Sequence, residues 1–159
     1  STPNRIVAEA LRNGALPAFA AYGTHRAEVR YGQASRADFL LTGAGLPDAL
    51  VEVKSVTLRR EGRLGEFPDT VTARGARHLA ELAAAAGEGR RAVLLYLLGR
   101  SDCDAVAVAG DIDPAYARAA EAAQVAGVEV IAHATRIAPE ELTLGPAVPV
   151  RPGSGKSRS

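Results

Sequence analysis

The spacing of hydrophobic and polar residues changes along the chain, and each change marks an expected element. Apolar residues recur at helical spacing in residues 2–12 and 71–86, and Asp113-Pro114 is typical of the start of a third helix. Shorter apolar runs predict strands at residues 27–31, 38–42, 49–56, 92–98 and 128–134. The pattern therefore predicts three helices and five strands, with a long polar connection at residues 57–69.

The expected order is helix, three strands, helix, strand, helix, strand (αβββαβαβ). Short connections make the first three strands antiparallel neighbours, and the later strand–helix–strand unit predicts a right-handed parallel crossover. We therefore expect an α/β fold with a mixed sheet flanked by helices, as one domain over residues 1–145. Residues 146–159 are rich in Pro, Gly, Ser and basic residues, which predicts a largely disordered tail.

Charged residues interrupt two of the apolar strands. Successive side chains of a strand point to opposite faces, so Glu52 and Lys54 share one face with Leu50. Asp38 begins the preceding apolar run, and a hairpin would bring it to the same open end as Glu52. Two carboxylates beside an ammonium can hold a divalent metal and position a water for attack on a phosphodiester. The alternative is that these are solvated strand residues, and the pattern alone leaves both open.

Composition narrows the function classes. The chain is 47% hydrophobic, which supports a packed core, whereas 4% aromatic residues argue against a stacking platform for single-stranded bases. A net charge of +1 means that a nucleic-acid partner must be recognised by a local patch. The single Cys103 excludes an internal disulfide and a thiolate metal cluster, as expected for a cytoplasmic protein. The sequence shows no signal peptide and no apolar run long enough to span a membrane.

Several longer segments carry a resemblance to a known family. The sequence resembles the sugar fermentation stimulation protein A (SfsA) family over nearly all of the chain up to the tail, and the spacing of Asp38 and Glu52-Val53-Lys54 resembles the PD-(D/E)XK nuclease signature. The matching segments are Asn4-Arg5 with Glu9-Ala10, residues 28–32, 35–39 and 51–58, the specific stretch Phe67–Leu79, Asp113 with Tyr116, and residues 127–130. The sequence has no counterpart of the small β-barrel with which family members usually begin, which we expect to affect DNA affinity more than chemistry.

The resemblance implies a DNA-binding protein with a restriction-endonuclease-like, nuclease-like domain. By motif position, Asp38 and Glu52 would hold Mg²⁺ (or Mn²⁺), and Lys54 would be the catalytic lysine. Glu9 is a further candidate metal ligand from the first helix, and Glu28 is a weaker one from the first strand. For both acids the alternative is an exposed surface position.

The same resemblance suggests which residues contact DNA. Arg36 lies next to Asp38, while Arg59 and Arg60, with Arg63, directly follow the lysine strand. Arg74 and His78 lie one helical turn apart and are expected to reach a phosphate or sugar. The alternative for each is a solvated surface side chain.

Three functions are consistent with these features. The first is Mg²⁺-dependent hydrolysis of DNA phosphodiesters by Asp38, Glu52 and Lys54. The second is a non-catalytic DNA-binding or regulatory module linked to the expression of sugar-metabolism genes. The third is an interaction domain that does not contact nucleic acid, which would fit the near-neutral charge. The sequence leaves the oligomeric state open.

Overall fold

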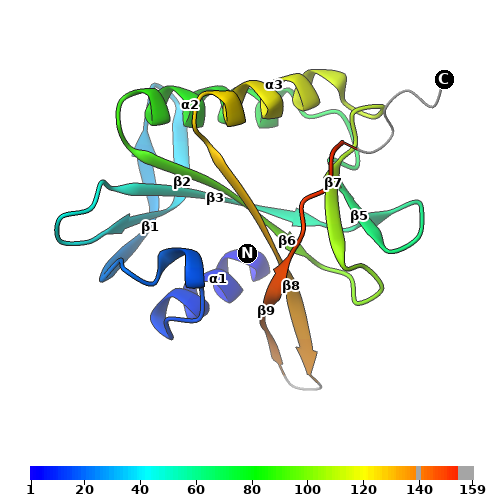
Figure 1. The fold of residues 1–159 in the computed structure, drawn as a ribbon, viewed down its shortest axis with the longest axis horizontal. Coiled ribbons are helices and arrows are strands. Elements are labelled where there is room, and N and C mark those ends of the chain that lie inside the picture. Colours follow the sequence, from blue (N-terminus) through cyan, green and yellow to red (C-terminus); the bar gives the residue numbers. More distant parts are fainter. Residues whose placement is uncertain (139–140, 154–159) are drawn as a thin grey trace.

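The computed structural model describes residues 1–138 and 141–153. A six-stranded sheet in the order β1-β2-β3-β6-β8-β9 forms its centre, and a three-stranded sheet in the order β4-β5-β7 lies beside it (Figure 1). The strands are β1 (Thr24–Tyr31), β2 (Ser35–Thr42), β3 (Ala49–Val56), β4 (Leu58–Arg59), β5 (Leu64–Phe67), β6 (Arg91–Leu98), β7 (Ala105–Val108), β8 (Glu129–Ala138) and β9 (Glu141–Val148). The helices are α1 (Thr2–Arg12), α2 (Ala73–Gly87) and α3 (Pro114–Val125), with a 3₁₀ turn η1 (Pro17–Phe19).

The α/β fold with a mixed sheet that was expected from the sequence is confirmed. Strands β1, β2 and β3 pair antiparallel, and β3, β6 and β8 pair parallel through the helical crossovers. Four strands were not expected. Strands β4, β5 and β7 are only two to four residues long, and the first two lie in the charged connection after β3. The assignment of this order to the restriction-endonuclease-like class stays a prediction.

The fourth unexpected strand, β9, crosses the domain boundary expected at residue 145. It contains Gly145 and Pro146, which favour a tail in the sequence, yet it pairs with β8 as an edge strand, where proline is tolerated. The chain then continues to Arg151, whose amide donates to the carbonyl of Val106 on β7 at 2.7 Å. Residues 154–159 of the expected disordered tail lie outside the described residues.

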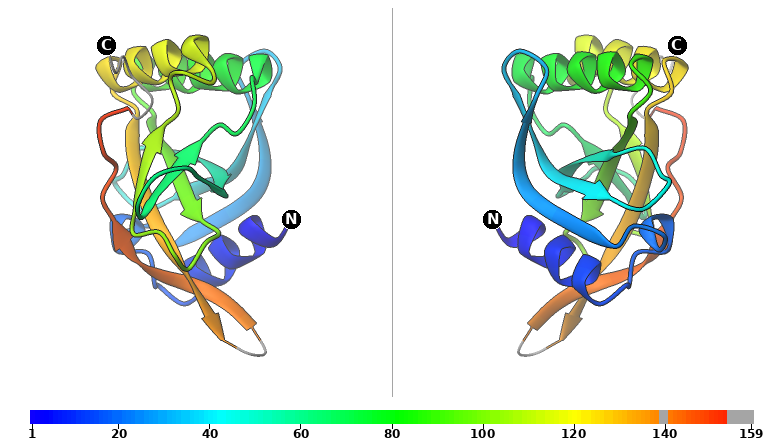
Figure 2. Two further views of the ribbon diagram at one scale, coloured as in Figure 1. Left: turned by 90° about the vertical axis from the view of Figure 1, so that its right-hand side faces the viewer. Right: turned by 90° about the vertical axis from the view of Figure 1, so that its left-hand side faces the viewer.

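Helices cover both faces of the large sheet. Helix α1 lies on one side, and α2 and α3 lie together on the other (Figures 1 and 2). The alternation of β3 is confirmed, because Val51 and Val53 pack with α1 while Leu50 packs in the core beneath α2 and α3. The charged residues of β3 therefore have α2 above them. Among the described residues, no helix has the length and apolar character that crossing a membrane would require.

A buried aspartate fixes where α2 begins. Asp113 caps α3 by accepting from the amide of Tyr116 at 3.0 Å, and its other oxygen accepts from the amide of Thr72 at 2.7 Å. Thr72 in turn caps α2 by accepting from the amide of Gly75 at 2.9 Å. Glycine is needed at position 75, because a Cβ there would lie 2.8 Å from the methyl group of Thr72. These contacts give the Phe67–Leu79 segment a structural role, because they anchor the first turns of α2 above β3.

Candidate active site

The candidate site lies where β2 and β3 separate. Their last paired residues are Phe39 and Val51. Beyond this pair, one oxygen of Asp38 accepts from the amide of Val53 at 2.7 Å, and the other accepts from the side-chain amide of Asn4 at 2.8 Å. Asp38 thus satisfies a backbone donor that the sheet leaves open, and it holds the start of α1 against the site.

The two faces of the β1–β2 hairpin exchange sides of the sheet next to Asp38. Glu28, opposite Asp38, has a φ of 55°, in the left-handed region that a non-glycine residue rarely adopts. On β2, Phe39 packs with α1 whereas Ala37 packs in the core beneath α2 and α3. Residues two apart on a regular strand share a face, so the hairpin must roll over between them. The roll carries the tip of the hairpin to α2, where the amide of Gln33 donates to Glu81 at 3.3 Å.

Glu52 is the buried centre of the site. It is only 6% exposed, and its Oε1 lies 3.5 Å from Nζ of Lys54 and 3.8 Å from Nδ1 of His78 on α2. Its second oxygen, Oε2, and His78 Nδ1 are buried without a hydrogen-bond partner in the part of the chain that the structure describes. The structure therefore brings together Asp38, Glu52, Lys54 and His78 from three elements.

The charges in this cluster are strongly coupled. Burial, and then the nearby Asp38, raise the pKa of Glu52 to about 7, while Lys54 opposes this rise. Burial and the cations Lys54 and Arg74 lower the pKa of His78, which favours the neutral imidazole. Arg74 Nε donates to His78 Nε2 at 3.4 Å, so the proton of the neutral ring is placed on Nδ1, the atom facing Glu52.

Tyr31 also belongs to this region, although its place in the matching segment 28–32 does not mark it as a site residue. It ends β1 and is 5% exposed. Burial, followed by the charge of Glu52, raises the pKa of its hydroxyl. Asn4, within another matching segment, likewise has no role predicted from the sequence, yet its side chain binds Asp38. Both lie within segments that match the family, and sequence spacing does not distinguish them from ordinary core or surface positions.

Two carboxylates are the strongest candidates for a metal. No group of three or more His, Cys, Asp or Glu side chains with metal-binding geometry occurs within residues 1–138 and 141–153. Glu9 on α1 therefore does not join Asp38 and Glu52 into a three-ligand cluster there. Mg²⁺ is commonly held by only one or two carboxylates together with water and phosphate oxygens, so the pair fits a hard divalent cation.

The arginines after β3 lie away from this cluster and face acidic partners. Arg59 lies 3.3 Å from Asp102. Arg60 makes paired hydrogen bonds to Glu66 and to Asp111, with distances of 2.7 to 2.9 Å. Their charge is therefore compensated within the fold, and a phosphate contact by either stays a prediction.

The tip of the β1–β2 hairpin carries a second pair of arginines. Arg36, which was predicted to contact DNA, lies directly opposite Arg30 across the two strands. Arg36 has a long ion pair of 3.9 Å with Glu28, and both side chains are largely exposed. Like charges placed opposite each other destabilise a hairpin unless an anion compensates them. A hollow of about 300 Å³ is lined by residues 30–36 at this tip.

Comparisons with protein families and with individual relatives identify the same family. The family described as "Sugar fermentation stimulation protein RE domain" matches residues 1–141. A sugar fermentation stimulation protein homolog of Ruegeria pomeroyi is 62% identical over 140 residues, which cover 88% of this chain and 61% of that protein. A homolog of Dinoroseobacter shibae is 54% identical over 154 residues, covering 97% of this chain and 63% of that protein.

One solved structure shows the same architecture. It is described as the structure of Pyrococcus furiosus SfsA in complex with Ca²⁺, and it superposes with a TM-score of 0.81 at 28% sequence identity. The match covers 90% of this chain and 61% of that chain. The present chain thus spans about three fifths of the length of the relatives it matches.

Proposed function

The chain belongs to the sugar fermentation stimulation protein (SfsA) family, and we propose that it is a PD-(D/E)XK-type nuclease domain that hydrolyses DNA phosphodiesters with Mg²⁺ or Mn²⁺. Asp38 and Glu52 hold the cation, and Lys54 assists the reaction. The site lies in the split between β2 and β3, beneath the first turns of α2.

The observation that carries this proposal is the state of Glu52. A buried carboxylate oxygen without a hydrogen-bond partner is costly unless the group is protonated or neutralised by a cation. Lys54 faces only Oε1, and Asp38 adds a second negative charge. A divalent cation between Asp38 and Glu52 removes both penalties at once.

The chemistry of the pair supports a hard cation. Carboxylate oxygens are the preferred protein ligands of Ca²⁺ and Mg²⁺, and the Pyrococcus furiosus relative is described in complex with Ca²⁺. When bound, such a cation supplies the positive charge that polarises a scissile phosphate and activates a water.

The position of Lys54 supports a role for it on the same phosphate. Its side chain is 20% exposed and reaches the site from the face of β3 that carries Glu52. The ammonium group can orient the attacking water or stabilise the charge that develops on the phosphorane-like transition state. This group is already positioned by its contact with Glu52, so little reorganisation is needed during the reaction.

Basic side chains around the cluster suit a DNA backbone. Arg74 holds the ring of His78 and lies close enough to influence the pKa of Glu52. Arg30 and Arg36 form the second basic site, on the hairpin tip that packs against α2. Contacts of this kind read phosphates rather than bases, so we expect binding that depends on salt and little on sequence.

One observation favours a second candidate, a module that binds DNA without cutting it. No cluster of three potential metal ligands occurs among the described residues, so a cation at Asp38 and Glu52 would depend on water for most of its coordination. A site of this kind would keep the basic contacts to DNA while lacking hydrolysis.

The test is cleavage of plasmid and of labelled single-stranded and duplex DNA, with Mg²⁺, Mn²⁺ or a chelator. We expect the wild-type chain to cut only with metal and the Lys54→Ala variant to be inactive. Arg118→Ala, which removes an exposed charge from α3, serves as the charge-matched control and should cut normally. Equal cleavage by wild type and Lys54→Ala would remove the assignment. DNA binding without cleavage under any metal, unchanged in Glu52→Gln, would support the second candidate.

A further inference from the structure

The two candidate metal ligands are held in place to different degrees. Both oxygens of Asp38 accept hydrogen bonds, from the amide of Val53 at 2.7 Å and from the side chain of Asn4 at 2.8 Å. The contacts of Glu52 are longer: Oε1 lies 3.5 Å from Nζ of Lys54, and Oε2 has no hydrogen-bond partner among the described residues. Rotation about the last bond of a glutamate side chain meets little resistance unless neighbouring groups fix the carboxylate. Glu52 therefore needs a further group to hold it.

His78 on α2 faces the same oxygen of Glu52. Its Nδ1 lies 3.8 Å from Oε1, and the His78 side chain is 14% exposed. Nδ1 is buried and has no hydrogen-bond partner in the part of the chain that the structure describes. The opposite ring nitrogen, Nε2, accepts from Arg74 Nε at 3.4 Å, so both nitrogens of the ring are directed at side chains of this cluster. An approach of about 1 Å brings Nδ1 and Oε1 to hydrogen-bonding distance.

Helix α2 fixes the position of this ring. The cap of α2 at Thr72 is tied to Asp113, and the buried Leu79 and Leu82 pack the helix into the core. His78 lies next to Leu79, on the second turn of the helix. A side chain on a packed helix is positioned more precisely than one on a loop. His78 can therefore act as a fixed point for the carboxylate of Glu52.

Lys54 alone is a poorer anchor for this carboxylate. Its ammonium group ends a flexible side chain that is 20% exposed. Under the proposed function, the same ammonium group acts on the water or on the phosphate. A second group on Oε1 would keep the carboxylate of Glu52 oriented while Lys54 makes those contacts.

We propose that His78 is a positioning residue that holds Oε1 of Glu52 through its Nδ1–H group, which leaves Oε2 available as a ligand for the cation. The inference rests on the proposed metal site, and it gives His78 a role other than the DNA contact predicted from the sequence. Groups that hydrogen-bond a metal-binding side chain help to set the affinity of the site for the metal. His78 should therefore affect cation binding even when no DNA is present.

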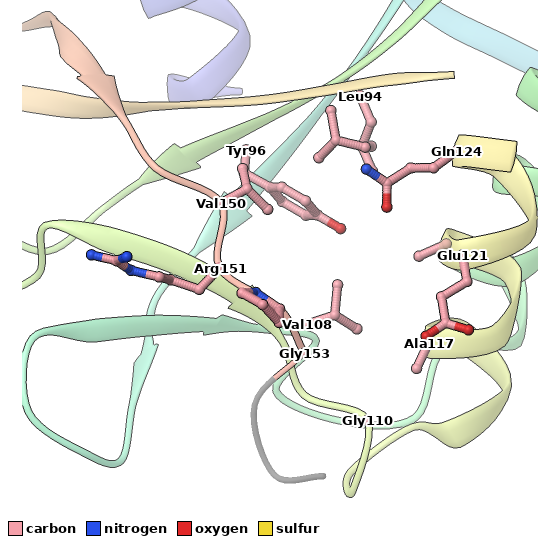
Figure 3. A pocket seen from close by; sticks show the side chains of 13 residues that line it. Leu94, Tyr96, Val108, Gly110, Ala117, Glu121, Gln124, Val150, Arg151 and Gly153 are labelled. Atoms are coloured by element: carbon pink, nitrogen blue, oxygen red, sulfur yellow. The ribbon is translucent and has the colours of Figure 1, made fainter. Parts of the chain in front are cut away.

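Two positions away from the cluster serve as controls. A separate cavity of about 230 Å³ lies beside α3, and its lining residues include Tyr96 and Gln124 but neither Glu52 nor His78 (Figure 3). Gln124→Ala therefore removes a side-chain amide that does not belong to the candidate site. His25 is a half-buried histidine of β1 whose ring lies edge-on to Phe39, and His25→Ala is the matched histidine control.

Titration of the full chain with Mn²⁺ in the absence of DNA, followed by electron paramagnetic resonance, tests the role of His78. We expect His78→Ala to weaken Mn²⁺ binding by about tenfold or more relative to wild type. His78→Asn keeps an N–H donor at the place of Nδ1 and should recover most of the lost affinity, whereas both controls should bind like wild type. Urea denaturation in EDTA checks that each variant is folded, and His78→Leu replaces His78→Ala if the smaller side chain prevents folding.

The outcomes separate the role of His78 from the metal site itself. A wild-type chain that binds no Mn²⁺ at millimolar concentration would contradict the proposed function, and this inference with it. Equal Mn²⁺ affinity of wild type and His78→Ala would overturn the inference alone. Equally weak binding by His78→Ala and His78→Asn would also overturn it, because the N–H donor would then not be the group that supports Glu52.

Discussion

Asp38 accepts a hydrogen bond from the backbone amide of Val53 at 2.7 Å, just beyond the last paired residues of β2 and β3. The carboxylate replaces a missing backbone acceptor, so the strands can separate without leaving a buried donor unsatisfied. The separation of the two strands opens a gap that gives access to Glu52 and Lys54. One side chain thus supports both the fold and the candidate site.

Substitution of Asp38 should separate these two roles. Asp38→Ala leaves the amide of Val53 without an acceptor and should lower the free energy of unfolding by about 1–3 kcal/mol. Asp38→Asn keeps a carbonyl acceptor and should cost clearly less, although both variants should lose affinity for a divalent cation. Urea denaturation in the presence of a chelator measures the first effect, and titration with Mn²⁺ measures the second. Equal stability of the two variants would contradict the structural role.

Glu52 should make stability depend on pH. Its pKa is raised from 4.5 to about 7, so the folded chain binds a proton more tightly than the unfolded chain does. Stability contributed by the protonated form is therefore present below the unfolded pKa and is lost as pH rises through the folded pKa. Without metal, Glu52→Gln should gain up to about 3 kcal/mol over wild type at pH 8 and little at pH 4.

The measurement is urea denaturation of both proteins across this pH range in EDTA. Glu88→Gln, at an exposed position after α2, is the matched control and should show no such gain. A constant difference between Glu52→Gln and wild type at all pH values would show that Glu52 titrates normally.

Glu28 carries backbone strain that glycine would relieve. Its φ of 55° costs a residue with a Cβ about 1–2 kcal/mol, and its exposed ion pair with Arg36 offsets little of this. Glu28→Gly should therefore raise the thermal midpoint, whereas Arg26→Gly, an exposed position on the same strand, should lower it. A loss of stability in both variants would contradict the proposed backbone strain at Glu28.

The parts of the fold that could be predicted from sequence are those with strong periodicity or clear caps. The continuous apolar run of β6 and the Asp113-Pro114 start of α3 are such cases, and both are confirmed. Strands β4, β5 and β7 are too short for a period to show, and Pro146 in β9 favours a tail. These strands exist because tertiary pairing supplies partners that local preference does not reveal.

The candidate site divides in the same way. Alternation along β3 is sufficient to place Glu52 and Lys54 on one face, and the structure brings His78 to them through α2. No spacing rule predicts that Asn4 binds Asp38, or that Arg60 is held by Glu66 and Asp111, because these contacts join segments far apart in sequence. Such pairs depend on the packing of α1 and of the smaller sheet.

The pKa of His78 should report the cations around the site. After burial, Lys54 lowers it more than Arg74 does. Lys54→Met should therefore raise the pKa of His78 more than Arg74→Met does, and Arg118→Met should leave it unchanged. Titration of the imidazole resonances by NMR gives the three values. The reverse order would show that Lys54 is directed away from the Glu52–His78 contact.

The central claim, a cation shared by Asp38 and Glu52, is tested most directly by anomalous diffraction from crystals of the chain soaked in Mn²⁺. We expect one strong peak between the two carboxylates, within about 2.6 Å of an oxygen of each. The same soak of Glu52→Gln crystals should show no peak. A wild-type map without a peak at this position, or with a peak that persists in Glu52→Gln, would contradict the proposed metal site.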